Sequence, residues 1–125
     1  MINFIVCDDE KEIVEKVKKI LMKIAFQANI EYKIHAFNSY DESFMQTMNS
    51  NLENKIYILD IEVEDSSGLE VAKQIREKDW KSIIVILTAH YELETLAYKS
   101  KILLLDFISK YELYDEKIYN IIKLC

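Results

Sequence analysis

The chain has no proline, one glycine, two cysteines and one arginine among its 125 residues. The scarcity of arginine argues against nucleic acid binding. All but one of the 16 basic residues are lysine, and 22 acidic residues leave a net charge of -6. Phosphate backbones are held by positive charge, and base edges in the major groove are read most often by arginine. We therefore expect no direct nucleic acid binding by this domain.

The two cysteines and the amino terminus bear on where the protein works. Cys7 lies in an apolar run and Cys125 is the last residue, a distribution that predicts neither a disulfide framework nor a cysteine metal site. The first residues lack a basic segment and turn acidic at Asp8, so neither a secretory signal nor a membrane span is expected. The length predicts one domain over residues 1–125, and the cysteine usage favours a reduced, cytoplasmic location.

Apolar runs and helical periodicities alternate along the whole chain. Runs typical of strands occupy residues 2–7, 31–37, 55–60, 82–87 and 102–108. Helical patterns cover residues 10–29 and 90–100. A second helix is predicted to begin at a capping box formed by Ser39 and Glu42, a third to end near Lys78, and a last one to close the chain from about residue 115. This alternation predicts parallel pairing through right-handed crossovers, with helices on both faces. The expected fold is a doubly wound, flavodoxin-like α/β sheet of five strands in the order 2-1-3-4-5.

Asp60 ends the third apolar run and is the leading candidate for chemistry. An aspartate at the carboxyl end of a central strand lies where open α/β sheets bind their ligands. The alternative is that Asp60 caps the helix that follows. Ser67 and Glu70 already form a capping-box pattern at that helix, which favours another role for Asp60. Gly68, the only glycine, is explained here by backbone freedom at a helix start.

Four of the five predicted strands end in residues capable of chemistry: Asp8 and Asp9, Asp60, Thr88 and Lys110. In a doubly wound sheet these ends converge on one crevice. Three carboxylates placed together would repel one another and raise their pKa values unless a cation is present. Oxygen ligands of this kind suit Mg²⁺ or Mn²⁺. With Lys110 and the Thr88 hydroxyl to hold anionic oxygens, the set describes a site that places a phosphoryl group on a carboxylate.

Each of these residues also has an ordinary structural interpretation when it is taken alone. Asp9 and Glu12 fit a capping box on the first helix. Lys110 alone is typical of a solvated lysine, Thr88 of a strand end, and Phe107 of a core residue. Their joint order and their placement at strand ends favour the functional interpretation.

In that joint order, Asp8-Asp9, Asp60, Thr88-Ala89 and Lys110 resemble the motifs of a bacterial response-regulator receiver domain, over essentially the whole chain. The phrase Leu-Asp-Phe-Ile-Ser-Lys at residues 105–110 further resembles the LytTR-type regulators, such as the accessory-gene-regulator family. The resemblance implies phosphorelay signalling, in which the domain is not a classical enzyme but assists its own phosphorylation and dephosphorylation.

The resemblance also implies a phosphoacceptor and its metal ligands. Asp60 would accept the phosphoryl group. Asp9 and Asp60 would bind Mg²⁺ directly, Asp8 would act mostly through water, and the backbone carbonyl of Glu62 would complete the protein's share of the ligands. Mn²⁺ is an alternative to Mg²⁺.

Further implied roles concern the phosphoryl oxygens, the switch and the partners. Thr88 and Lys110 would each bind a phosphoryl oxygen, and Thr88 with Phe107 would form the switch that reshapes the face made by the fourth helix, fifth strand and fifth helix. The implied partners are a sensor histidine kinase, a second copy of the chain after phosphorylation, and DNA through a LytTR-type output domain if the full-length protein has one. No membrane partner is implied.

Two departures from the family pattern stand beside these matches. Receivers usually follow the lysine with a proline in a cis peptide bond, whereas Tyr111 follows Lys110 here. A cis bond without proline costs roughly 3 to 4 kcal/mol. The missing proline therefore raises the question of whether the Lys110 side chain reaches Asp60. Glu62 and His90 occupy positions that in this family tune the lifetime of the phosphoryl group.

Three rival functions follow from the same fold class. A flavin- or nucleotide-binding domain would need a loop rich in glycine, serine or threonine after the first strand, where this chain has three acids that repel phosphate. A metal-dependent hydrolase of the haloacid dehalogenase type is suggested by Asp60-Ile-Glu62 but lacks a clear cap. A pseudo-receiver, which acts as an interaction module without phosphorylation, is the main alternative and is suggested by Tyr111.

Overall fold

The computed structural model describes residues 1–63, 66–99, 102, 104–111 and 114–123. Its main sheet contains five parallel strands: β1 (Ile2–Cys7), β2 (Tyr32–Phe37), β3 (Lys55–Leu59), β6 (Ile83–Thr88) and β7 (Asp106–Ser109). The order across the sheet is β2-β1-β3-β6-β7. Because the short strands β4 (Glu62–Val63) and β5 (Ser66–Ser67) form a separate antiparallel hairpin, this is the predicted order 2-1-3-4-5, and the predicted fold is confirmed.

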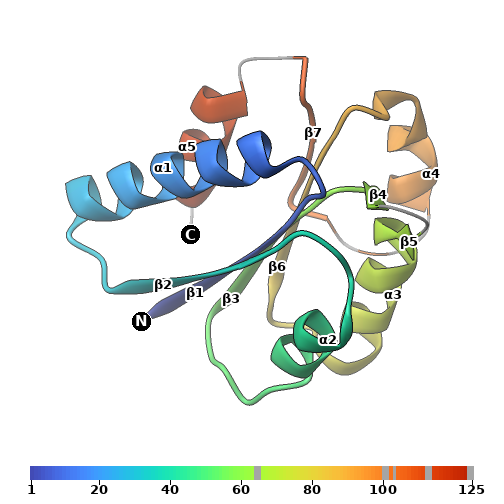
Figure 1. Cartoon of the computed structure of the whole chain (residues 1–125), viewed down its shortest axis with the longest axis horizontal. Helices are drawn as coiled ribbons and strands as arrows, with labels where there is room; N and C mark the ends of the chain where they lie inside the picture. Colours follow the sequence, from blue (N-terminus) through green and yellow to red (C-terminus); the bar gives the residue numbers. More distant parts are fainter. Residues whose placement is uncertain (64–65, 100–101, 103, 112–113, 124–125) are drawn as a thin grey trace.

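Helices cover both faces of the sheet, as predicted. They are α1 (Lys11–Ala28), α2 (Glu42–Met48), α3 (Gly68–Lys78), α4 (Glu94–Lys99) and α5 (Tyr114–Lys123), with a short 3-10 turn η1 (Tyr91–Leu93) before α4. Figure 1 shows α1 and α5 together on one face and α2, α3 and α4 on the other. Among the described residues, no helix has the length and apolar character needed to cross a membrane.

The central strands are buried on both faces, which explains their unbroken apolar runs. On β1, Phe4 and Val6 pack toward α1 and α5, whereas Ile5 and Cys7 pack toward α2, α3 and α4. Cys7 is a free, buried thiol. Successive strand residues point to opposite faces, so the two cores are separated by one sheet.

The fifth strand and the fourth helix are shorter than predicted. β7 begins at Asp106 rather than at residue 102, and the helical pattern of residues 90–100 resolves into η1 and a six-residue α4. The main chain at Ile102 is held by Arg76 of α3, whose Nε donates to the Ile102 carbonyl. The paired register with β6 starts at Val85 and Asp106, just after Leu105 N donates to the carbonyl of Ile84 in β6. Ser100 and Cys125 lie outside the described residues.

Local capping also differs from prediction at two helices. The capping box predicted at Ser39 and Glu42 is wrong, since Asp41 caps α2 by accepting a 2.9 Å hydrogen bond from Phe44 N. At α1 the first residue outside the helix is Glu10, whose side chain makes no cap bond, so the alternative that assigned the cap to Asp9 is wrong. At α3 the predicted cap is confirmed, because the Ser67 hydroxyl accepts from Glu70 N.

Candidate functional site

The strand ends bring the candidate residues to one edge of the sheet. Cys7 of β1 lies beside Leu59 of β3 in parallel register, and Asp60 N donates to the carbonyl of Cys7 at 3.1 Å. The residues that follow these two strands, Asp8 and Asp60, are therefore neighbours. On the other side of β3, Thr88 ends β6 beside Ser109 of β7, and Lys110 comes directly after.

Three carboxylates form a compact cluster at this edge. One oxygen from each of Asp8, Asp9 and Asp60 lies within 4.8 Å of the other two. Asp8 and Asp60 are buried, with 3% and 4% of their surface exposed, whereas Asp9 is exposed to solvent. All the donors are carboxylate oxygens and one side remains open to solvent, a combination that fits Mg²⁺ or Mn²⁺ with water ligands.

Lys110 inserts its ammonium group between the buried carboxylates. Its Nζ lies 2.8 Å from Asp8 Oδ2 and 3.1 Å from Asp60 Oδ2, and a third acid, Glu10, approaches at 3.2 Å. Burial alone would lower the Lys110 pKa, but the bonds and charges of Asp8 and Asp60 outweigh burial and raise that pKa above its ordinary value. Lys110 is therefore a fixed positive charge beside Asp60.

The same neighbourhood changes the acidity of Asp8. Burial raises the Asp8 pKa to about 6, and the charge of Asp60 adds to that rise. Hydrogen bonds from Lys110 and from Glu10 N act in the opposite direction without cancelling it. The single positive charge of Lys110 therefore does not neutralise the negative charges of Asp8, Asp9 and Asp60. The remaining negative charge favours binding of a divalent cation.

The reach of Lys110 does not depend on a proline after it. Tyr111 occupies that position, its backbone N–H donates to Ser109 Oγ at 3.1 Å, and the described peptide bonds include no cis bond. Lys110 N donates to the Thr88 carbonyl at 2.9 Å, which ties the end of β7 to the end of β6. The side chain of Lys110 reaches Asp60 from this trans backbone.

Thr88 is completely buried at the end of β6. Its hydroxyl oxygen accepts a hydrogen bond from His90 N at 3.1 Å, so the hydroxyl hydrogen is still able to serve a donor role. Phe107 is also buried, in the core beneath α3 and α4, with its ring 6.5 Å from that of Tyr98.

The side chains of Glu62 and His90 contact each other. His90 Nε2 lies 2.9 Å from Glu62 Oε2, and Nδ1 of the same ring lies 3.3 Å from Glu92 Oε1. Glu62 N points to Asp60 Oδ1 at 3.4 Å. The residues two positions after Asp60 and Thr88 are therefore joined side chain to side chain, and this contact links the start of β4 to the segment after β6.

Two contributors at this edge were not predicted from the sequence. The Glu10 carboxylate binds Lys110, and the hydroxyl of Tyr40 donates a 2.6 Å hydrogen bond to the Asp60 carbonyl. Gly68 has a different reason from the one predicted, because its φ is not positive. A Cβ on Gly68 would lie 2.0 Å from the Asp60 carbonyl oxygen, so close approach of two backbones excludes any side chain.

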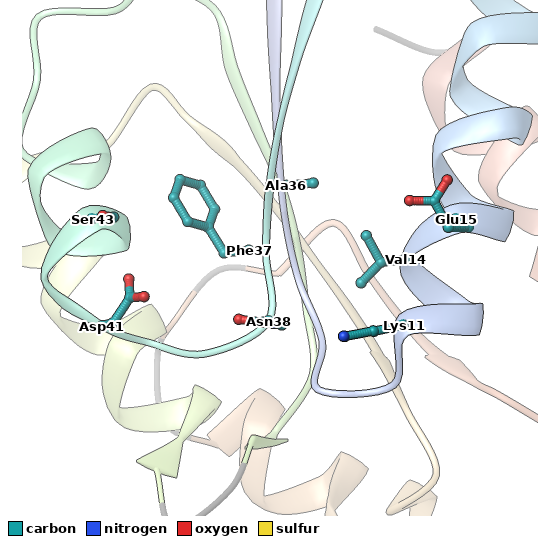
Figure 2. Close-up of a pocket in the computed structure, with 8 residues that line it drawn as sticks. All are labelled: Lys11, Val14, Glu15, Ala36, Phe37, Asn38, Asp41 and Ser43. Carbon is teal, nitrogen blue, oxygen red and sulfur yellow. The ribbon is translucent and has the colours of Figure 1, made fainter.

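One hollow lined by described residues is separate from the carboxylate cluster. It has a volume of about 600 Å³ and lies between the first turns of α1 and α2 at the end of β2 (Figure 2). Its lining consists of Lys11, Val14, Glu15, Ala36, Phe37, Asn38, Asp41 and Ser43. Asp8, Asp9 and Asp60 do not contribute to that lining.

Comparison with known proteins identifies the family. The sequence model described as the response regulator receiver domain matches residues 4–123. The chain belongs to this family. As a receiver domain, it is a module of two-component phosphorelay signalling, and the acidic cluster fits the metal site of such domains.

Individual relatives agree with this assignment. Accessory gene regulator protein A of Staphylococcus epidermidis is 40% identical over 55 residues, which are 43% of this chain and 23% of that protein. The chain thus matches less than a quarter of that relative's length. The response regulator TrrA of Thermotoga maritima, solved in complex with Mg²⁺ and beryllium fluoride, is 29% identical with a TM-score of 0.77, and the match covers 100% of both chains. The response regulatory domain of mrkE from Klebsiella pneumoniae shares the fold, with a TM-score of 0.80, 18% identity, and 98% and 93% of the two chains covered.

Proposed function

We propose that Asp60 accepts a phosphoryl group from a sensor histidine kinase in a reaction that needs Mg²⁺. The observation that carries the proposal is the meeting of Asp8, Asp9 and Asp60 within 4.8 Å, with the Lys110 ammonium 3.1 Å from Asp60 Oδ2. The proposal extends to residues 1–125 as one receiver domain. The relative TrrA, which binds Mg²⁺ and beryllium fluoride, supports the metal requirement.

In this reaction an Asp60 carboxylate oxygen attacks the phosphorus of the phosphohistidine. The new O–P bond forms as the P–N bond breaks, and the imidazole of the kinase leaves with the electron pair. When bound, Mg²⁺ neutralises the phosphoryl oxygens and the carboxylates. Asp9 and Asp60 would hold it directly, Asp8 mostly through water, and the Glu62 carbonyl from the loop.

Lys110 and Thr88 supply the remaining contacts to the phosphoryl group. The Lys110 charge is already fixed beside Asp60 and needs little reorganisation as negative charge arrives. The Thr88 hydroxyl would donate to a second phosphoryl oxygen. To make this bond, Thr88 would move toward the phosphoryl group. That movement, together with one of Phe107, would change the conformation of the face formed by α4, β7 and α5.

The consequence we propose for this face is a two-fold contact between copies of the chain. Tyr98 of α4 has an exposed ring that feels the charge of Asp106 of β7. Lys99 of α4 adds a positive charge to this face, and Glu116 of α5 adds a negative charge. Charges of both signs suit a self-complementary surface. Sedimentation with and without beryllium fluoride and Mg²⁺ tests this: dimers are expected only with both, and a monomer in every condition would contradict the contact.

The output of a longer protein would be transcriptional. The 55-residue match to accessory gene regulator protein A supports a LytTR-type output domain, which would contact DNA in place of the receiver itself. The main alternative is a pseudo-receiver. Tyr111 suggests that alternative, and the contact between Lys110 and Asp60 supports phosphorylation instead.

Phosphorylation by a small donor tests the assignment. Incubation of the purified chain with acetyl phosphate and Mg²⁺ is expected to add one base-labile acyl phosphate, which Asp60→Asn should abolish. The matched control is Asp79→Asn at the opposite end of the strands, where Asp79 Oδ1 accepts hydrogen bonds from Lys81 N and Ser82 N. Equal labelling of the parent and Asp60→Asn would contradict the proposal.

A further inference from the structure

A buried tyrosine holds the main chain at the proposed phosphoacceptor. Tyr40, in the loop between β2 and α2, donates its hydroxyl hydrogen to the carbonyl oxygen of Asp60 at 2.6 Å. This carbonyl lies just past Leu59, the last residue of β3. A buried carbonyl needs a donor, and Tyr40 supplies it from a segment twenty residues earlier in the chain.

The position of the Tyr40 ring is itself fixed. The ring packs edge-on against Phe44, with a centroid distance of 4.9 Å and an interplanar angle of 82°. Phe44 lies in the first turn of α2, where its backbone N–H is bound by the neighbouring Asp41 carboxylate. A rigid ring that is 9% exposed keeps its hydroxyl in one place, so the hydrogen bond to Asp60 is held from a capped helix.

Gly68 confines the same peptide group from a second direction. A Cβ on Gly68 would lie 2.0 Å from the Asp60 carbonyl oxygen and 2.8 Å from its carbon. Gly68 N also donates to the carbonyl of Ile61, the next residue. The carbonyl of Asp60 is therefore enclosed between the Tyr40 hydroxyl and the start of α3, with little room to rotate.

The orientation of this carbonyl bears on the chemistry at Asp60. The carboxylate of Asp60 is held by Lys110 and by Glu62 N, and its direction depends on the backbone dihedrals at the same residue. We infer that Tyr40 is a positioning residue for phosphoryl transfer: its hydroxyl fixes the Asp60 main chain and with it the carboxylate and the Glu62 carbonyl. The inference rests on the proposed function of Asp60.

Loss of the hydroxyl should therefore slow the reaction. A shift of the reacting atoms by about 1 Å can cost up to roughly 100-fold in rate. Tyr40→Phe keeps the ring and its packing on Phe44 but removes the donor, so a smaller displacement follows. We expect the rate constant for phosphorylation at saturating acetyl phosphate to fall by about five- to tenfold.

The chain offers a matched control in Tyr57. It is a fully buried tyrosine on β3 whose hydroxyl has no hydrogen-bond partner among the described residues. Tyr57→Phe therefore also removes a buried tyrosine hydroxyl, on the strand that leads to Asp60, but it removes no hydrogen bond among the described residues. Its rate constant is expected to stay within about twofold of the parent.

The measurement is the formation of acyl phosphate by parent, Tyr40→Phe and Tyr57→Phe at saturating acetyl phosphate, as a function of Mg²⁺, at a temperature where all three are folded. Tyr40→Phe should be slower and should need more Mg²⁺ for half of its maximal rate. A purely structural role would lower its unfolding midpoint and leave its rate in the folded state equal to the parent's, which would overturn the inference.

Two further outcomes are distinguishable. If the parent itself takes up no phosphoryl group, the proposed function fails and the inference fails with it; if only the effect of Tyr40→Phe is missing, the inference fails alone. Should Tyr40→Phe not fold, proton NMR of the parent replaces it. The Tyr40 hydroxyl proton is then expected to exchange slowly and to shift when beryllium fluoride and Mg²⁺ are added, and an unshifted resonance would contradict the inference.

Discussion

Replacement of Asp8 by asparagine is predicted to stabilise the metal-free protein at neutral pH. Asp8 is buried, and its pKa rises from 3.8 to about 6 because burial and the charge of Asp60 outweigh the contact with Lys110. The folded state binds this proton more tightly than the unfolded chain. The stabilisation of the folded state by protonated Asp8 is therefore fully present below pH 4 and is lost as the pH rises through 6. The shift corresponds to roughly 3 kcal/mol of unfolding free energy.

Urea unfolding followed by circular dichroism, in excess chelator and at several pH values, measures this effect. The parent and Asp8→Asn are expected to have similar unfolding free energies near pH 4, since asparagine resembles the protonated acid. At pH 7 the variant should be more stable by up to about 3 kcal/mol. Saturating Mg²⁺ should then stabilise the parent more than the variant. A difference that does not change with pH, or a variant less stable than the parent at pH 7 in chelator, would refute the reasoning.

Two other predictions concern the basic residues. Lys110→Met should lower the rate of phosphorylation by roughly 100-fold, because it removes the fixed positive charge beside Asp60; a rate within threefold of the parent in an acetyl phosphate assay would exclude that role. Arg76→Lys should lower the unfolding free energy by roughly 2 kcal/mol, because one ammonium group cannot replace a guanidinium that binds the carbonyls of Ile102 and Ser82. Thermal unfolding checks it, and an unchanged midpoint would contradict it.

Most of the fold could be predicted because the strands carry a strong pattern. β1 and β3 are buried on both faces, so their sequences are nearly continuous apolar runs. The edge strand β7 carries a weaker signal. Ile102 is as deeply buried as a strand residue, yet β7 begins only at Asp106, and the Ile102 carbonyl accepts a hydrogen bond from Arg76 of the distant α3.

The residues of the candidate site could be predicted where they lie at the ends of predicted strands. Asp8, Asp60 and Lys110 follow directly from where the apolar runs stop, and the parallel register brings them together. Tyr40 and the reason for Gly68 could not be predicted, since both depend on the approach of one backbone segment to another across the fold. A tyrosine before a helix has no local pattern that distinguishes such a hydrogen bond from ordinary packing.

The identity of the residue that carries the phosphoryl group is the most direct test of the account. Reduction of the phosphorylated chain with sodium borohydride converts an aspartyl phosphate to homoserine, and peptide mass spectrometry then locates it. The account predicts homoserine at residue 60 alone, only after incubation with phosphodonor and Mg²⁺. Homoserine at Asp8 or Asp9, or none at residue 60 in a chain that has taken up phosphate, would contradict it.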